Sequence, residues 1–91
     1  MVNVIVLLTV EPAKVQDVAS ALADMDRVSE VYSVGGRFDL VVMVRARDID
    51  EIAEIVPGAI LKVPGITDSE TLIAFRASSK YDLERTFSLG M

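Results

Sequence analysis

Apolar residues fill nearly every position at the start of the chain. Residues 2–10 read VNVIVLLTV, a run of β-branched and aliphatic side chains that stops at Glu11-Pro12. A continuous apolar run of this length is typical of a strand that is covered on both faces. We therefore expect the first strand over residues 2–10.

Apolar residues at steps of three and four follow this strand. They are Val15, Val18, Ala19, Leu22 and Met25, and they lie opposite the polar Lys14, Gln16, Asp17, Ser20 and Asp24. Such a stripe predicts an amphipathic helix, and Pro12 suits its first turn.

Two further strands are predicted in the middle of the chain. Residues 28–34 and 40–44 are rich in β-branched and aliphatic residues, and a hairpin containing Gly35-Gly36 separates them. Residues 66–76 have the same character and predict a fourth strand.

A second helix is expected between the third and fourth strands. Asp48 followed by Glu51 has the form of a capping box, which marks a helix start. The apolar stripe that follows consists of Ile49, Ile52, Ile55, Val56 and Ala59. Pro57-Gly58 should kink or split this helix.

The predicted order is βαββαβ, and two similar segments, residues 27–31 and 62–66, lie 35 positions apart before two of the strands. With right-handed crossovers, both helices cover one face of a four-stranded antiparallel sheet, the ferredoxin-like α+β arrangement. The other face keeps apolar residues such as Ile5, Leu7, Val41 and Met43. Exposing them would create a patch of the size found at interfaces, so we expect two sheets to pack face to face as a dimeric α/β barrel.

Composition supports a small globular domain that associates. The chain has 91 residues, of which 52% are hydrophobic, and a chain this short buries a modest fraction of its surface alone. Its net charge of −5 gives no field to hold a polyanion, so no direct nucleic-acid binding is expected. Neither a leader peptide nor a membrane span is predicted, which favours a cytoplasmic protein.

The chain has no cysteine and no histidine. This removes thiol chemistry, disulfides, the usual zinc ligands and the side chain that most often serves as a general base. We expect no cofactor and no metal. The acidic run Asp48, Asp50, Glu51 and Glu54 should complement a helix dipole and face water.

The cationic side chains of Arg37, Arg45 and Arg47 are too few for a nucleic-acid patch. We expect them to guard strand ends or to pair with carboxylates of a neighbouring subunit.

The glycine hairpin has two physical explanations. The backbone N–H groups of Gly35-Gly36 can approach the carboxylate of a small ligand closely, and Asp39 can pair with its ammonium. Alternatively, the glycines form a tight turn with positive φ, and Asp39 accepts hydrogen bonds from its own loop. The local sequence leaves both explanations open.

Residues 31–44, VYSVGGRFDLVVMV, are similar to a glycine-aromatic-aspartate hairpin of the leucine-responsive and asparagine-operon regulators, the Lrp/AsnC family. Residues 62–66 and 69–73 resemble the proline-glycine turn and the threonine-bearing last strand of that family. The resemblance covers residues 1–76 and only the C-terminal effector module, the RAM (regulation of amino-acid metabolism) domain. Because Met1 leads straight into a strand, we expect a stand-alone RAM domain without the helix-turn-helix.

This resemblance implies dimers that assemble further, often four to a ring, with amino acids bound between dimers. It also implies a set of ligand-binding residues, which in this chain are Gly35, Gly36, Phe38, Asp39 and Thr71, with Ser69 more loosely. Val34 and Phe38 stand where the family often has threonine and tyrosine. Fewer hydroxyl groups favour an aliphatic ligand.

The expected function is therefore a non-enzymatic effector module that oligomerises and binds an amino acid. It acts either in mixed oligomers with full-length Lrp/AsnC regulators or as an amino-acid sensor for another protein. A purely structural oligomerisation partner is one alternative. A small α/β-barrel enzyme is another, for which Asp39 with Tyr32 or Tyr81 is the best acid–base pairing available. Residues 77–91 are expected to be a C-terminal extension, either a short helix starting near Ser79 and Asp82 or a frayed tail.

Overall fold

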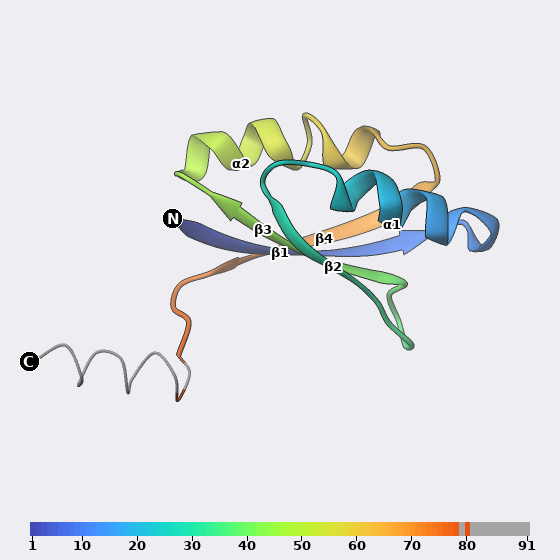
Figure 1. The fold of residues 1–91 in the computed structure, drawn as a ribbon, viewed down its shortest axis with the longest axis horizontal. Coiled ribbons are helices and arrows are strands. Elements are labelled where there is room, and N and C mark those ends of the chain that lie inside the picture. The colour runs from blue at the N-terminus through green and yellow to red at the C-terminus, as the bar shows by residue number, and fades with distance from the viewer. Residues whose placement is uncertain (79, 81–91) are drawn as a thin grey trace, which may run out of the picture.

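The computed structural model describes residues 1–78 and 80 (Figure 1). Four strands and two helices follow one another in the predicted βαββαβ order. They are β1 (Val2–Val10), α1 (Val15–Ala23), β2 (Val28–Ser33), β3 (Leu40–Ala46), α2 (Ile49–Ile55) and β4 (Ile66–Ala74). Two short 3₁₀ turns, η1 (Pro12–Lys14) and η2 (Ile60–Lys62), precede α1 and follow α2. The ferredoxin-like prediction is confirmed.

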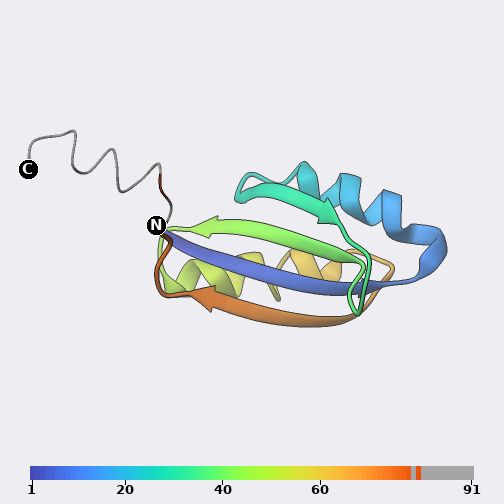
Figure 2. The ribbon, with the colours of Figure 1, turned by 90° about the horizontal axis from the view of Figure 1, so that it is seen from below.

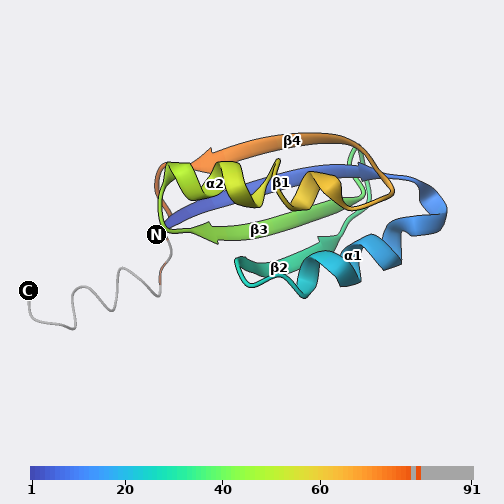
Figure 3. The same cartoon turned by 90° about the horizontal axis from the view of Figure 1, so that it is seen from above.

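The sheet has the strand order β2-β3-β1-β4, and every neighbouring pair is antiparallel. The first strand therefore lies in the middle, hydrogen-bonded to β3 on one side and β4 on the other. Both helices lie on one face of the sheet (Figures 1 and 3). Figure 2 looks onto the other face, which we call the open face and which no helix among the described residues covers.

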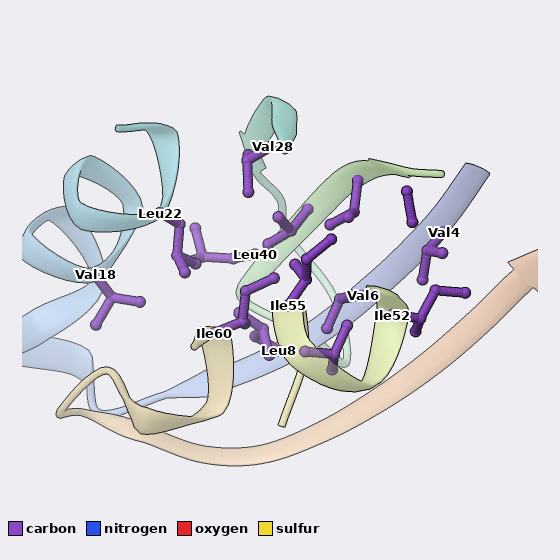
Figure 4. Close-up of a cluster of buried hydrophobic side chains, with 14 of the residues drawn as sticks. Val4, Val6, Leu8, Val18, Leu22, Val28, Leu40, Ile52, Ile55 and Ile60 are labelled. Carbon is purple, nitrogen blue, oxygen red and sulfur yellow. The ribbon is translucent and has the colours of Figure 1, made fainter. Parts of the chain in front are cut away.

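The core lies between the sheet and the helices (Figure 4). Alternate residues of the two central strands are buried there, namely Val4, Val6, Leu8, Val10, Leu40, Val42, Val44 and Ala46. The helices contribute Val18 and Leu22 from α1 and Ile52 and Ile55 from α2. Strand residues at a period of two thus meet helix residues at a period near 3.6, as the sequence pattern predicts.

The second helix ends where proline was expected to break it. Pro57 has no N–H to donate to the carbonyl of Ala53, and α2 stops at Ile55 before the chain turns into η2. At Gly58 the backbone passes so close to α2 that an added Cβ would lie 2.3 Å from the Glu54 carbonyl oxygen. Only glycine fits this path, so the predicted split is confirmed and has a steric cause.

The prediction that the acidic run faces water is wrong for Glu51, whose side chain is 7% exposed. One carboxylate oxygen accepts a hydrogen bond from the Arg47 backbone N–H at 2.7 Å and lies 3.2 Å from Arg27 Nε. The other accepts from Arg47 Nε at 2.8 Å. Arg47 directly follows the end of β3, which agrees with the first expectation for it, a position that guards a strand end. It pairs with a carboxylate of its own chain and not, as the alternative had it, with one of a neighbouring subunit.

This ion-pair cluster makes stability depend on pH. The Arg47 backbone N–H, chiefly, together with the Arg47 side chain and the charge of Arg27, lowers the pKa of Glu51 although burial opposes the shift. A lowered pKa in the folded state means that the stabilisation is complete above the ordinary glutamate value, about 4.5. It is then lost as the pH falls through the folded-state pKa.

We expect Glu51→Gln to lower the melting temperature at pH 7, and this deficit to shrink towards zero below the folded-state pKa. Thermal unfolding followed by circular dichroism between pH 2 and pH 7 measures both. Glu54→Gln, in the same helix but exposed, is the matched control and should follow the parent curve. A deficit for Glu51→Gln that stays constant with pH would contradict the assignment.

Candidate functional site

The glycine hairpin, residues 34–39, connects β2 to β3. The Val34 N–H donates to the Asp39 carbonyl at 3.0 Å and closes the loop. Of the two glycines, only Gly36 has positive φ, at 134°, so the predicted positive-φ turn holds for one of them. A Cβ added to either glycine would meet no atom within 4 Å, so the loop backbone is open to an approaching group. In Figure 1 the hairpin projects away from the helical layer.

Asp39 fastens this hairpin to the central strand. Its backbone N–H donates to the Leu8 carbonyl at 2.8 Å, and its Oδ2 accepts from the Val10 N–H at 2.8 Å. The carboxylate was expected to bond within its own loop if it had no ligand role, but its partner is the neighbouring strand. Within the described part of the chain, Oδ1 has no hydrogen-bond donor. One carboxylate oxygen therefore holds the hairpin and the other is free to meet a ligand.

Phe38 and Arg37 form a stacked pair in the same loop. Phe38 is half-buried, and the Arg37 guanidinium carbon lies 5.0 Å from the centre of its ring. This is cation–π geometry, and it places a positive charge on the same loop that carries the carboxylate of Asp39.

Ser69 and Thr71 lie in β4, where they pair with Leu8 and Val6 of β1. Because Leu8 and Val6 point into the core, Ser69 and Thr71 belong to the helix-covered face of the sheet. Asp39 binds the Leu8 carbonyl, so the hairpin and Ser69 lie at the same end of the sheet. However, β1 runs between them, and two strand spacings separate β3 from β4 by about 10 Å.

One chain therefore does not join the two predicted halves of the site in a single pocket. Four surface depressions lie elsewhere, and no residue of the hairpin lines any of them. One, of about 210 Å³, is on the open face beside Met43 and Arg45. Another, of about 270 Å³, lies between α1 and Pro64. None of these four depressions brings the hairpin together with Ser69 and Thr71.

The open face is apolar in its middle and charged at its margins. Ile5, Leu7, Val41 and Met43 are half-buried in the single chain, and Leu72 is 44% exposed. Beside them, the Tyr32 hydroxyl donates to the Glu30 carboxylate, and this bond raises the pKa of Tyr32.

Sequence reasoning missed the contribution of Val10. Its role is a backbone N–H, which every residue except proline carries, so no side-chain signal marks it. It also gave Arg37 no part in the hairpin, although an arginine next to an aromatic residue in a short loop is a signal for stacking.

The sequence predicts no membrane span, no metal site and a possible helix in the C-terminal extension. Over residues 1–78 and 80, no helix is long and apolar enough to span a membrane. In the same residues no three acidic side chains gather in a metal-binding cluster. The helix predicted in the C-terminal extension depends on Ser79, Asp82, Leu83 and Phe87, which lie outside the described residues.

Solved structures share this fold and architecture. The protein TTHA0845 from Thermus thermophilus is 40% identical, with a TM-score of 0.83, and the match covers 88% of this chain and all of that one. AsnC from E. coli is 23% identical, with a TM-score of 0.80 and coverage of 86% and 53%. The Neisseria meningitidis regulator NMB0573, solved as a complex with L-Met, is 12% identical, with a TM-score of 0.78 and coverage of 86% and 52%.

Sequence comparison indicates the same relationship. The HTH-type transcriptional regulator FL11 of Pyrococcus abyssi is 30% identical over 71 residues, which are 78% of this chain and 46% of the regulator. This chain thus spans about half the length of the curated relatives it matches. The family model described as the Lrp/AsnC ligand binding domain matches residues 3–83. That family is a ligand-binding domain of transcription regulators and not an enzyme family. Because the match covers most of the chain, the chain belongs to the Lrp/AsnC ligand-binding domain family, as its glycine hairpin and last strand indicate.

Proposed function

We propose that this chain is an amino-acid-binding effector module that oligomerises and modulates Lrp/AsnC-type transcription regulation without itself binding DNA. The observation that carries the proposal is the open glycine hairpin. Its backbone is unobstructed, and Asp39 holds it against β1 with one carboxylate oxygen left over. In a chain that belongs to a ligand-binding family, such a loop has the chemistry to bind a small zwitterion.

An amino acid needs both charges matched when it leaves water. Backbone N–H groups around Gly35 and Gly36 are suited to the carboxylate, and Asp39 Oδ1 to the ammonium. Ser69 and Thr71 supply hydroxyl groups from β4. Because about 10 Å separates the two strands in one chain, we assign the hairpin and β4 contacts of one ligand to different chains.

The ligand class we propose is an aliphatic amino acid. Val34 and Phe38 bring no hydroxyl to the hairpin, and Phe38 offers an apolar surface. The N. meningitidis regulator is a distant relative whose structure was solved with L-Met, an amino acid with an apolar side chain.

Assembly is proposed to begin through the open face. Its half-exposed apolar centre has the character of an interface rather than of a water-facing surface. Two sheets packed there form a dimeric α/β barrel, and dimers joined around their hairpins form a larger ring, a tetramer of dimers.

Regulation is proposed to pass through assembly in the cytoplasm. The net charge of −5 disfavours contact with DNA. A mixed oligomer with full-length Lrp/AsnC regulators is the partner that we propose. An amino acid changes such an equilibrium only if it binds one assembly more tightly than another.

The test is thermal unfolding in the presence of each of the twenty amino acids at millimolar concentration. A ligand at about 100 times its dissociation constant adds roughly 2.7 kcal/mol to the free energy of unfolding, a shift of several degrees for a chain of this size. We expect a selective rise with leucine, isoleucine or valine.

Light scattering on the same samples verifies that the oligomer is intact. No shift with any amino acid, while the oligomer persists, would contradict the receptor function. It would favour instead the role of a purely structural oligomerisation partner. That role needs no ligand site, so it is compatible with the separation of the hairpin from Ser69 and Thr71 within one chain.

A further inference from the structure

The hairpin carries the positive charge of Arg37, to which the proposed function gives no role. The Arg37 guanidinium carbon lies 5.0 Å from the centre of the Phe38 ring. Phe38 is half-buried, so the ring is anchored in the fold and limits the motion of the arginine stacked on it. A guanidinium that lies over an aromatic ring still has N–H donors with which it can bind another group.

No carboxylate of the described residues pairs with Arg37. The ion pairs among these residues involve Lys14, Arg27 and Arg47, and the last two share Glu51. Arg37 is exposed and lies on a loop that projects from the sheet (Figure 1). In a chain with fourteen acidic and nine basic residues, an arginine without a carboxylate partner on a protruding loop is available for an incoming anion.

The surroundings define which anion fits. Gly36, with φ of 134°, precedes Arg37, and the space around its Cα is open. The residue after Phe38, Asp39, carries a negative charge, and its Oδ1 has no hydrogen-bond donor among the described residues. The hairpin thus presents a cation, an apolar ring and an anion at three consecutive positions, Arg37, Phe38 and Asp39. These match the carboxylate, the apolar side chain and the ammonium of an amino acid.

We propose that Arg37 is a specificity-determining residue, which binds the α-carboxylate of the amino acid through paired N–H donors and selects free amino acids over their amides. This inference rests on the proposed function and adds a charged side chain to the backbone N–H groups of Gly35 and Gly36 that are proposed to meet the carboxylate. The planar fork of arginine matches the two oxygens of a carboxylate, which lysine cannot do.

The test changes Arg37 in the protein and the carboxylate in the ligand, singly and together. Calorimetric titrations of L-leucine, L-isoleucine, L-valine and their carboxamides are compared for the parent protein, Arg37→Gln and Arg37→Lys. The carboxamide keeps the ammonium and the side chain but lacks the negative charge. Lys62→Gln, which removes an exposed charge in η2, is the control for the change in net charge.

We expect Arg37→Gln to weaken binding of the free amino acid by about tenfold or more, because a hydrogen bond to a charged group is worth roughly 1.5–3 kcal/mol. Carboxamide binding should not change, so the preference for the free amino acid falls by the same factor. Arg37→Lys should lie between, and Lys62→Gln should match the parent. Melting temperatures without ligand should be equal, since the Arg37 side chain is exposed.

Two results would overturn the proposal, and they differ. If the parent binds a free amino acid and Arg37→Gln keeps both its affinity and its preference over the carboxamide, Arg37 does not recognise the carboxylate, and the receptor function stands. If the parent binds no amino acid while remaining assembled, the receptor function and the inference both fail.

Discussion

The Gly58→Ala variant is expected to unfold at a temperature lower by on the order of 10 °C. An added Cβ would lie 2.3 Å from the Glu54 carbonyl oxygen and 3.0 Å from its carbonyl carbon, and both are backbone atoms of α2 that no rotamer change can move. The helix and the following turn must separate, which loosens the packing of Ile55 and Ile60. Overpacking of this kind costs roughly 1–3 kcal/mol, or 4–8 °C for each kcal/mol in a domain of this size.

Differential scanning calorimetry measures the change. Gly35→Ala is the matched control, because its Cβ would meet no atom within 4 Å and its φ is not positive. It should melt within a degree or two of the parent. Equal melting of Gly58→Ala and the parent would show that the approach of Gly58 to α2 does not constrain the fold.

The Asp39→Asn variant is expected to lose nearly all of the amino-acid-dependent rise in melting temperature while melting normally without ligand. Asparagine keeps a side-chain oxygen that can accept from the Val10 N–H, so the hairpin stays attached to β1. It lacks the negative charge that the ligand ammonium requires. The loss should approach the full 2.7 kcal/mol or so that ligand at about 100 times its dissociation constant provides.

Asp39→Ala separates the two roles of this carboxylate. It leaves the part-buried Val10 N–H without an acceptor, which costs roughly 1–3 kcal/mol, so it should melt earlier even without ligand. Asp17→Asn, an exposed position on α1, is the control for charge. A full ligand-dependent rise in Asp39→Asn would show that the carboxylate only holds the hairpin and does not contact the amino acid.

The fold could be predicted from the sequence because each element follows from a local pattern. The period of two in β3 and the stripe of α1 each select one buried face, and Pro57 ends α2 for a reason contained in its own ring. The strand ends were less predictable. β4 was expected to reach Arg76 but ends at Ala74, which pairs with Asn3 near the start of β1. Pairing partners set a strand end, and they lie far away in the sequence.

The candidate site was predicted less completely, because its bonds join distant residues. The hydrogen bond from the Val10 N–H to Asp39 spans 29 positions. Likewise, Glu51 was expected in water because acids at helix starts usually face it. Besides the nearby Arg47, Glu51 pairs with Arg27, which lies 24 positions earlier in the loop between α1 and β2. Neither contact produces a periodic pattern in the sequence. The ligand-binding roles themselves rest on a family resemblance.

The central position of β1 in the sheet has a consequence for folding during synthesis on the ribosome. The first of the four strands along the chain, β1, pairs with β3 and with β4, and its pairing with β4 joins Asn3 to Ala74. Until β4 leaves the exit tunnel of the ribosome, the apolar strand β1 has one edge with no strand to pair with. Contacts of such long sequence separation form slowly. We therefore expect the pairing of β1 with β4 to complete the sheet late in folding.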